Sequence, residues 1–108
     1  MLFAVRYRLK PGRTEAESKQ IRDLLMKWQA PPGLDVKNHY HYVSGAGVVI
    51  VDTLESAALY EALGPFKPLV EFDVEPVINI LEALAISTDI DEWVATALAG
   101  PNGSVGHP

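Results

Sequence analysis

The sequence predicts an α+β protein: a ferredoxin-like βαββαβ domain with an antiparallel four-stranded sheet, followed by a C-terminal helix. Strand-like and helical stretches alternate in that order, and turn residues separate them. Of the 108 residues, 21% are charged and 48% hydrophobic, a composition typical of a globular chain with one core. We expect residues 1–99 to form one domain and residues 100–108, polar and Gly-rich, to form a flexible tail.

The first strand and the first helix have clear boundary signals. Residues 2–9, LFAVRYRL, are rich in β-branched and aromatic side chains and lead into a Pro-Gly turn signal. Thr14 and Glu17 then match a capping box, in which each side chain satisfies a backbone amide of the other residue. A helix follows, because apolar residues recur at helical spacing until a Pro-Pro-Gly stretch at 31–33 ends it. The apolar residues at this spacing are Ile21, Leu24, Leu25 and Trp28.

A hairpin and a second helix are predicted next. We expect a strand over residues 36–43, a turn at 44–47 and a strand over residues 48–53, VVIVDT. Apolar residues at helical spacing predict a helix over residues 55–63, which a Gly-Pro pair interrupts.

The last two predicted elements are a strand and a short helix. Residues 70–81, VEFDVEPVINIL, place apolar side chains from Phe72 to Ile80 on one strand face. Pro76 cannot donate a ladder hydrogen bond, which favours an edge strand or a bulge. Residues 87–100, STDIDEWVATALAG, begin with cap residues and acids and end in Gly, which predicts the terminal helix.

The strand over residues 48–53 is apolar on both faces, with Val48 and Ile50 on one side and Val49 and Val51 on the other. The two helices of this topology cover one face of the sheet, so an apolar second face needs another cover. A second copy of the sheet is the simplest cover, since most oligomers are two-fold dimers. We therefore expect a homodimer that pairs as a dimeric α+β barrel.

Charge and composition argue against several function classes. The net charge is −5 and the nine Lys and Arg residues are scattered, which argues against nucleic-acid and membrane surfaces. Without cysteine, the chain has no disulfides, thiolate nucleophiles or Cys-ligated metals. No stretch approaches the roughly 18 apolar residues of a membrane span, and the N-terminus lacks a secretory-signal pattern. We expect a cytoplasmic protein.

Several segments give the chain a resemblance to a known superfamily. They are MLFAVRYRLKPG, KWQAPPGLDVK, GVVIVDT and LGPFKPLVEFDVEPV. In these segments the chain resembles the dimeric α+β-barrel superfamily, and within it an uncharacterised bacterial family of unknown function. Muconolactone isomerases, antibiotic-biosynthesis monooxygenases, polyketide cyclases and haem-handling enzymes are better-known members. The resemblance implies the fold and the dimer, and it brings no catalytic residue, because fold alone does not fix function.

Residues 38–45, NHYHYVSG, contain the main candidates for chemistry. His39 and His41 alternate on a strand, so their side chains emerge on the same face. Histidine is suited to acid-base catalysis, and a pair with Asp52 as a third ligand would resemble a metal site. A third interpretation is a pair that simply hydrogen-bonds at a solvent-facing or dimer-facing surface. We assign no metal and no other cofactor.

Four further side chains are candidates for substrate binding. Tyr40 and Tyr42 share the other face of the strand, and each combines an apolar ring with a polar tip. One strand face meets the helices, so either the histidines or the tyrosines line a pocket within the monomer. Arg6 is a candidate anion clamp or a member of a cross-strand ion-pair ladder. Trp28 belongs to the core or closes a pocket mouth.

Two functions are consistent with these residues, and the sequence leaves open whether the protein is an enzyme. One is a small cofactor-independent isomerase, cyclase or oxygenase that acts on an apolar or aromatic metabolite between sheet and helices. The other is a non-catalytic dimeric module that binds a ligand or a partner protein. An apolar cavity beside a histidine of perturbed pKa favours the enzyme. An interior without a cavity favours the module, its space filled by Phe3, Val5, Tyr7, Phe72 and Trp28.

Overall fold

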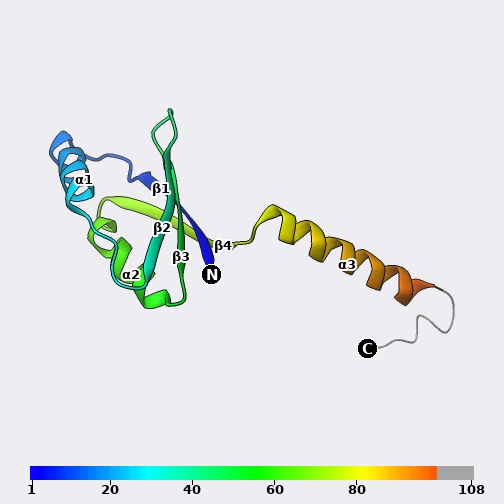
Figure 1. Ribbon diagram of the computed structural model, residues 1–108. Coiled ribbons are helices and arrows are strands. Elements are labelled where there is room, and N and C mark those ends of the chain that lie inside the picture. The colour runs from blue at the N-terminus through cyan, green and yellow to red at the C-terminus, as the bar shows by residue number, and fades with distance from the viewer. Residues whose placement is uncertain (100–108) are drawn as a thin grey trace. The chain divides into compact units, whose positions relative to one another are not determined.

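A computed structural model describes residues 1–99 and confirms the α+β class and the order of elements (Figure 1). The predicted flexible tail at 100–108 lies outside these residues. The elements are β1 (Leu2–Leu9), α1 (Glu15–Lys27), β2 (Leu34–His41), β3 (Gly47–Thr53), α2 (Ser56–Leu63), the 3₁₀ turn η1 (Gly64–Phe66), β4 (Val70–Val77) and α3 (Ile80–Leu98).

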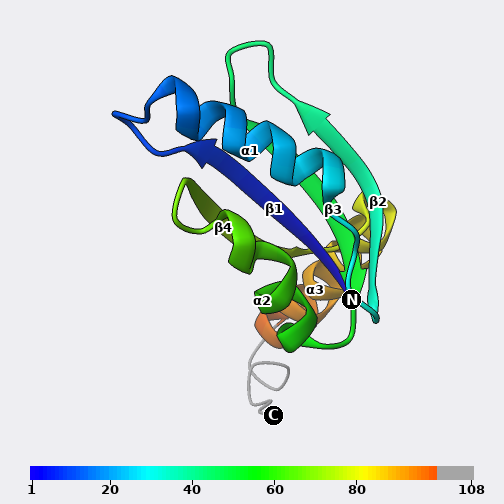
Figure 2. The same cartoon turned by 90° about the vertical axis from the view of Figure 1, so that its left-hand side faces the viewer.

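The four strands form one antiparallel sheet in the order β2-β3-β1-β4, which is the ferredoxin-like topology. Helices α1 and α2 lie on the same face of this sheet, as Figure 2 shows. The core lies between these helices and the sheet and consists of Val5, Leu34, Val51, Ala58, Leu59 and Ala62. We call the opposite side, which carries neither α1 nor α2, the second face.

Helix α1 begins at the predicted capping box. The Thr14 hydroxyl accepts the Glu17 amide at 3.1 Å, and the Glu17 carboxylate accepts the Thr14 amide at 2.9 Å. Two of the amides that a helix start leaves unpaired are thereby satisfied. Together with α2, which ends at Leu63 as predicted, this helix covers the side of the sheet opposite the second face.

Strand β2 lies two residues earlier than predicted and contains a β-bulge. Val36 pairs with Val51 and Asn38 pairs with Ile50, which leaves Lys37 as an extra residue. An extra residue reverses the in-out alternation of the strand beyond it. Leu34 and Val36 face the helices before the bulge, and the two histidines face the helices after it.

The predicted boundary between the last strand and the last helix is wrong. Strand β4 ends at Val77, and the Asn79 side chain caps α3 by accepting the Leu81 amide at 2.8 Å. The strong helix formers Leu-Glu-Ala-Leu-Ala at 81–85 start the helix early. Ser87 and Thr88, which resemble caps in the sequence, instead donate to carbonyls one turn back inside the helix, at 2.9 and 3.1 Å.

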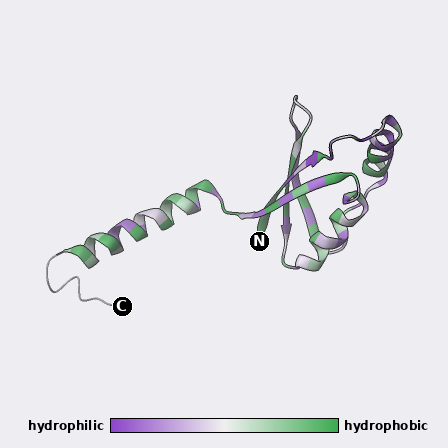
Figure 3. Cartoon of the chain, turned by 180° about the vertical axis from the view of Figure 1, so that it is seen from behind, coloured by the Kyte–Doolittle hydropathy of each residue, from purple (hydrophilic) through white to green (hydrophobic). Residues whose placement is uncertain are grey.

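The chain divides into two compact units, one over Met1–Val77 and one that begins at Ile78. The first unit holds the whole βαββαβ arrangement. Figure 3 shows hydrophobic residues along much of α3, and its exposed large apolar side chains are Ile80, Leu81, Leu84, Ile86, Ile90, Trp93, Val94 and Leu98. Across residues 1–99, no helix combines the length and the apolar character needed to cross a bilayer.

Candidate functional site

Both histidines meet Tyr7 on the helix-facing side of the sheet. Tyr7 in β1 pairs with Gly47 in β3, which pairs with His41 in β2, so one row crosses three strands. The Tyr7 hydroxyl lies 2.7 Å from His39 Nε2 and 3.3 Å from His41 Nδ1. The Tyr7 and His39 rings meet edge to face, with centroids 5.5 Å apart and planes at 77°. Tyr7 is therefore the shared hydrogen-bond partner of the pair.

Gly47 makes this contact possible. The Tyr7 ring lies over the buried Gly47 backbone, and a Cβ built at Gly47 would overlap the Tyr7 hydroxyl and ring. A glycine inside a strand often marks such a close approach. Because position 47 has no side chain, Tyr7 can extend across β3 to reach β2.

An apolar cavity of about 120 Å³ lies between the sheet and the helices, and Tyr7 and His39 line it. Most of its wall is aliphatic or aromatic, for example Val5, Leu59 and Phe72. Trp28 also lines it, and its indole Nε1–H is already satisfied by the Ala62 carbonyl at 3.1 Å. Among the described residues that line the cavity, none is Lys, Arg, Asp or Glu. The polar side-chain atoms available to a ligand are therefore those of Tyr7 and His39.

Burial shifts the pKa of both partners in the direction that keeps them neutral near pH 7. Desolvation raises the pKa of the Tyr7 phenol above its ordinary value of 10.0. Desolvation, followed by the charge of His41, lowers the pKa of His39 below its ordinary value of 6.5. One arrangement that satisfies all three groups has the Tyr7 hydroxyl donating a hydrogen bond to Nε2 of a neutral His39, the shorter contact, and accepting one from His41 Nδ1–H.

Two predicted substrate-binding residues lie on the second face, away from the histidines. The Arg6 guanidinium donates to the Glu75 carboxylate at 2.9 Å, and Arg8 lies 3.5 Å from Glu71, so both join a cross-strand ion-pair ladder. Tyr40 pairs with Val48 on the same face and is 62% exposed. The structure does not bring Arg6 or Tyr40 to the cavity.

Tyr42 follows the end of β2 and lines a separate, more polar hollow of about 280 Å³. Arg6, Arg8 and Asp73 also line this hollow. Of the four substrate-binding candidates, Trp28 is the one that lines the apolar cavity with His39.

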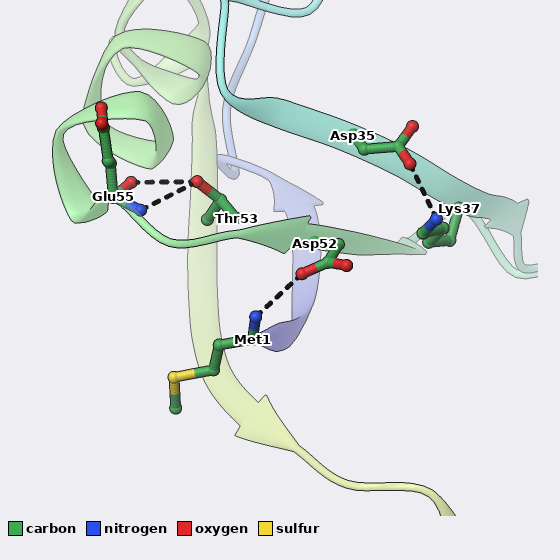
Figure 4. Close-up of polar contacts among 6 residues, drawn as sticks. All are labelled: Met1, Asp35, Lys37, Asp52, Thr53 and Glu55. Carbon is green, nitrogen blue, oxygen red and sulfur yellow. Dashed lines mark hydrogen bonds and ion pairs between the residues drawn. The ribbon is translucent and has the colours of Figure 1, made fainter.

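Asp52, the acid considered as a third metal ligand, lies far along β3 from the histidines. It pairs with Leu2 and Asp35 on the second face, and its carboxylate accepts the Met1 amine at 2.8 Å (Figure 4). This contact lowers the pKa of the Asp52 carboxyl. Within residues 1–99, no three His, Cys, Asp or Glu side chains are grouped to hold a metal ion. The metal interpretation with Asp52 does not fit this geometry.

Tyr7 is the site residue that the sequence did not single out. It shares a strand face with Phe3 and Val5, so its pattern predicts a core position. Tyr7 differs from these core residues because it pairs with Gly47, over which its ring can extend. That pairing depends on the register of two strands, and the alternation within one strand does not specify the register.

Comparison with known proteins identifies the family of the chain. Residues 1–91 match the family model described as a domain of unknown function, DUF3303. No curated protein matches the chain at a significant level. The match spans all the strands, both sheet-covering helices and the first part of α3. The chain therefore belongs to the DUF3303 family.

Proposed function

We propose that the protein is a small cofactor-independent enzyme that moves a proton on an apolar or aromatic metabolite. One observation carries this proposal: Tyr7 and His39, hydrogen-bonded at 2.7 Å, both line an apolar cavity between sheet and helices. Proton transfer next to a carbonyl is promoted by a base beside the carbon that loses the proton and a hydrogen-bond donor beside the carbonyl oxygen, in a pocket that holds the substrate. The lowered pKa of His39 and the raised pKa of Tyr7 support these roles.

The proposed step is an isomerase-type enolisation. A substrate carbonyl oxygen takes the hydrogen bond of Tyr7, which frees the Nε2 lone pair of His39. His39 removes a proton from the adjacent carbon, the C–H electron pair forms a C=C bond, and the carbonyl π electrons move to oxygen. That oxygen takes the Tyr7 proton, while the His41 Nδ1–H bond stabilises the phenolate. His39 then returns its proton to Tyr7, so the site is restored and the product is the enol.

The second face supports a homodimer as part of this proposal, in the manner of the dimeric α+β-barrel superfamily. Ala4, Val48 and Ile50 form an apolar strip on that face of β1 and β3. A strip of this kind in the middle of a sheet gains stability when another apolar surface covers it. Two copies that face each other would cover both strips.

A second candidate function is a non-catalytic dimeric module that binds a ligand or a partner protein. Helix α3 favours it, since none of its residues is buried and its large apolar side chains are exposed. Exposed apolar surface of this extent is typical of protein interaction sites.

Deuterium incorporation from D₂O into the α-carbon of cyclohexanone, followed by proton NMR, tests the enzyme. We expect Tyr7→Phe to slow the exchange by about 10²-fold, the usual size of an acid-base contribution. His39→Ala combined with His41→Ala should abolish the exchange and leave a folded protein. Tyr40→Phe, which makes the same chemical change on the second face, is the matched control and should not alter the rate. Full exchange in the double histidine variant would disprove the proposed site, and no exchange above buffer by the wild-type protein would favour the module.

A further inference from the structure

The cavity is close in size to one six-membered ring. Its volume of about 120 Å³ is slightly below the roughly 150 Å³ of an apolar cavity that binds benzene in another protein. A bicyclic ligand exceeds this volume, so its second ring would have to extend out of the cavity or displace the packed wall.

The wall of the cavity is electrically neutral. No Lys or Arg is among the described residues that line it, and Arg6 and Arg8 are paired with acids on the second face. A carboxylate that binds such a site gains no counter-charge for the hydration that it gives up, which is unfavourable. His39 does not supply that charge, because burial keeps it neutral near pH 7.

One corner of the wall is polar. The Tyr7 hydroxyl and the His39 Nε2 lie 2.7 Å apart and are hydrogen-bonded to each other, so a ligand oxygen must bind beside this bond or replace it. A ligand hydroxyl can donate to a free lone pair of the Tyr7 oxygen, and a ligand carbonyl can accept from Tyr7 when it takes the place of His39 as the partner of the phenol. His41, at 3.3 Å from the Tyr7 oxygen, holds the phenol in place.

We infer that the cavity takes a neutral, single-ring molecule with one hydroxyl or carbonyl oxygen, and that this oxygen hydrogen-bonds to Tyr7 beside His39. This inference rests on the proposed function, since the same pair would transfer the proton. It adds the ligand class: simple phenols and cyclic ketones bind, and aromatic carboxylates do not.

Titration of the full chain at pH 7 with phenol, toluene, benzoate and 2-naphthol, followed by NMR, tests the inference. We expect phenol to bind at least about a hundredfold more tightly than benzoate and to give contacts to the Val49 and Val51 methyl groups, which line the cavity. Tyr7→Phe should weaken phenol binding about tenfold and leave toluene binding within about twofold. Tyr40→Phe is the control and should change neither.

Each of the following results would overturn one part of the inference. Benzoate bound as tightly as phenol overturns the neutral class, and 2-naphthol bound as tightly overturns the single-ring size. Phenol and toluene bound equally, with no effect of Tyr7→Phe, overturn recognition of the oxygen. If no ring compound binds at millimolar concentration, the inference is wrong, whereas histidine-dependent exchange of the cyclohexanone α-protons would still support the proposed function.

Discussion

At the scale of single residues, the site depends on the pairing of a large side chain with the smallest one. The Tyr7 hydroxyl reaches two histidines on β2 because Gly47, which lies between Tyr7 and His41 in the cross-strand row, has no side chain. The cavity wall and the hydrogen-bonded pair therefore both depend on the close packing of the Tyr7 ring over Gly47. A change at Gly47 should affect stability and chemistry together.

We expect Gly47→Ala to destabilise the fold by about 1–3 kcal/mol, the usual cost of overpacking, because the new Cβ would overlap the Tyr7 ring. Gly64→Ala is the matched control. Beyond its chain neighbours, no atom lies within 4 Å of a Cβ built at Gly64, so alanine should cost less there than at Gly47, although Pro65 disfavours the helical φ and ψ of −51° and −47° for a non-glycine residue before it. Urea unfolding measures both, and equal effects of the two substitutions would contradict the proposed role of Gly47.

The pKa shifts of His39 and Tyr7 predict how stability changes with pH. The pKa of His39 is lower in the folded state than its ordinary 6.5, so the unfolded chain binds more protons below that pH. The stability that neutral His39 contributes is present above pH 6.5 and is lost as the pH falls through the folded pKa. The pKa of Tyr7 is raised, so its contribution is present below pH 10.0 and is lost as the pH rises beyond it.

Between pH 6.5 and pH 10.0, these two groups should leave the free energy of unfolding independent of pH. Denaturant unfolding at pH 7.5 and 5.5 checks the acid side, and the loss on acidification should be smaller in His39→Gln than in the wild type. The lowered carboxyl pKa values of Asp23 and Asp52 act in a separate window, because their ordinary value is 3.8. An unchanged loss in the variant would show that His39 is not the group responsible.

At the scale of elements, the bulge in β2 decides which face the histidines occupy. The alternation of residues 38–42 correctly predicts that the two histidines share one face and that Tyr40 points the other way. It cannot predict which of the faces meets the helices, because Lys37 reverses the phase between Val36 and His39. A bulge depends on the pairing of two strands and has no signature in one of them.

Deletion of Lys37 tests this explanation. The partners of Val36 and Asn38 are already consecutive residues of β3, so removing Lys37 should leave a regular strand with both histidines still toward the helices. We expect NMR titration of the variant to show a His39 pKa below 6.5, as in the wild type. Lys37→Ala keeps the bulge but removes the surface contact with Asp35 at 2.7 Å. It therefore separates the loss of the bulge from the loss of the ion pair. A His39 pKa at its ordinary value in the deletion variant alone would contradict this account of the register.

Helix α3 illustrates a different limit of the sequence. Its strong helix formers at 81–85 follow directly on the alternating pattern of β4, so a short apolar run fits either structure. The Asn79 cap sets the boundary, and a capping residue at the end of a strand is easily assigned to the strand. By contrast α1 was predictable throughout, because the capping box and the Pro-Pro-Gly stretch bound its apolar stripe on both sides.

At the scale of the whole molecule, the described core comes from one unit. Its buried members, from Val5 to Ala62, lie within Met1–Val77, on the side of the sheet that α1 and α2 cover. The second face of that unit keeps the apolar strip of Ala4, Val48 and Ile50 between charged borders that include Arg6 and Glu75. A core plus a charged rim is the arrangement expected of an interface between folded copies.

Ile50 lies at the centre of that strip, between Ala4 and Asn38 on the neighbouring strands, so it is the position at which a charge should disrupt a dimer most. We expect the wild-type protein to show twice the mass of one chain in light scattering at micromolar concentration, and Ile50→Asp to show the mass of one chain. An unpaired buried carboxylate costs several kcal/mol, and one kcal/mol weakens association about fivefold, so the shift should be complete. Val43→Asp is the matched control, because Val43 in the β2–β3 turn is 108% exposed and should tolerate the same charge with no change in mass. A wild-type protein with the mass of one chain would remove the dimer, and a dimer that persists in Ile50→Asp would move the interface away from the second face.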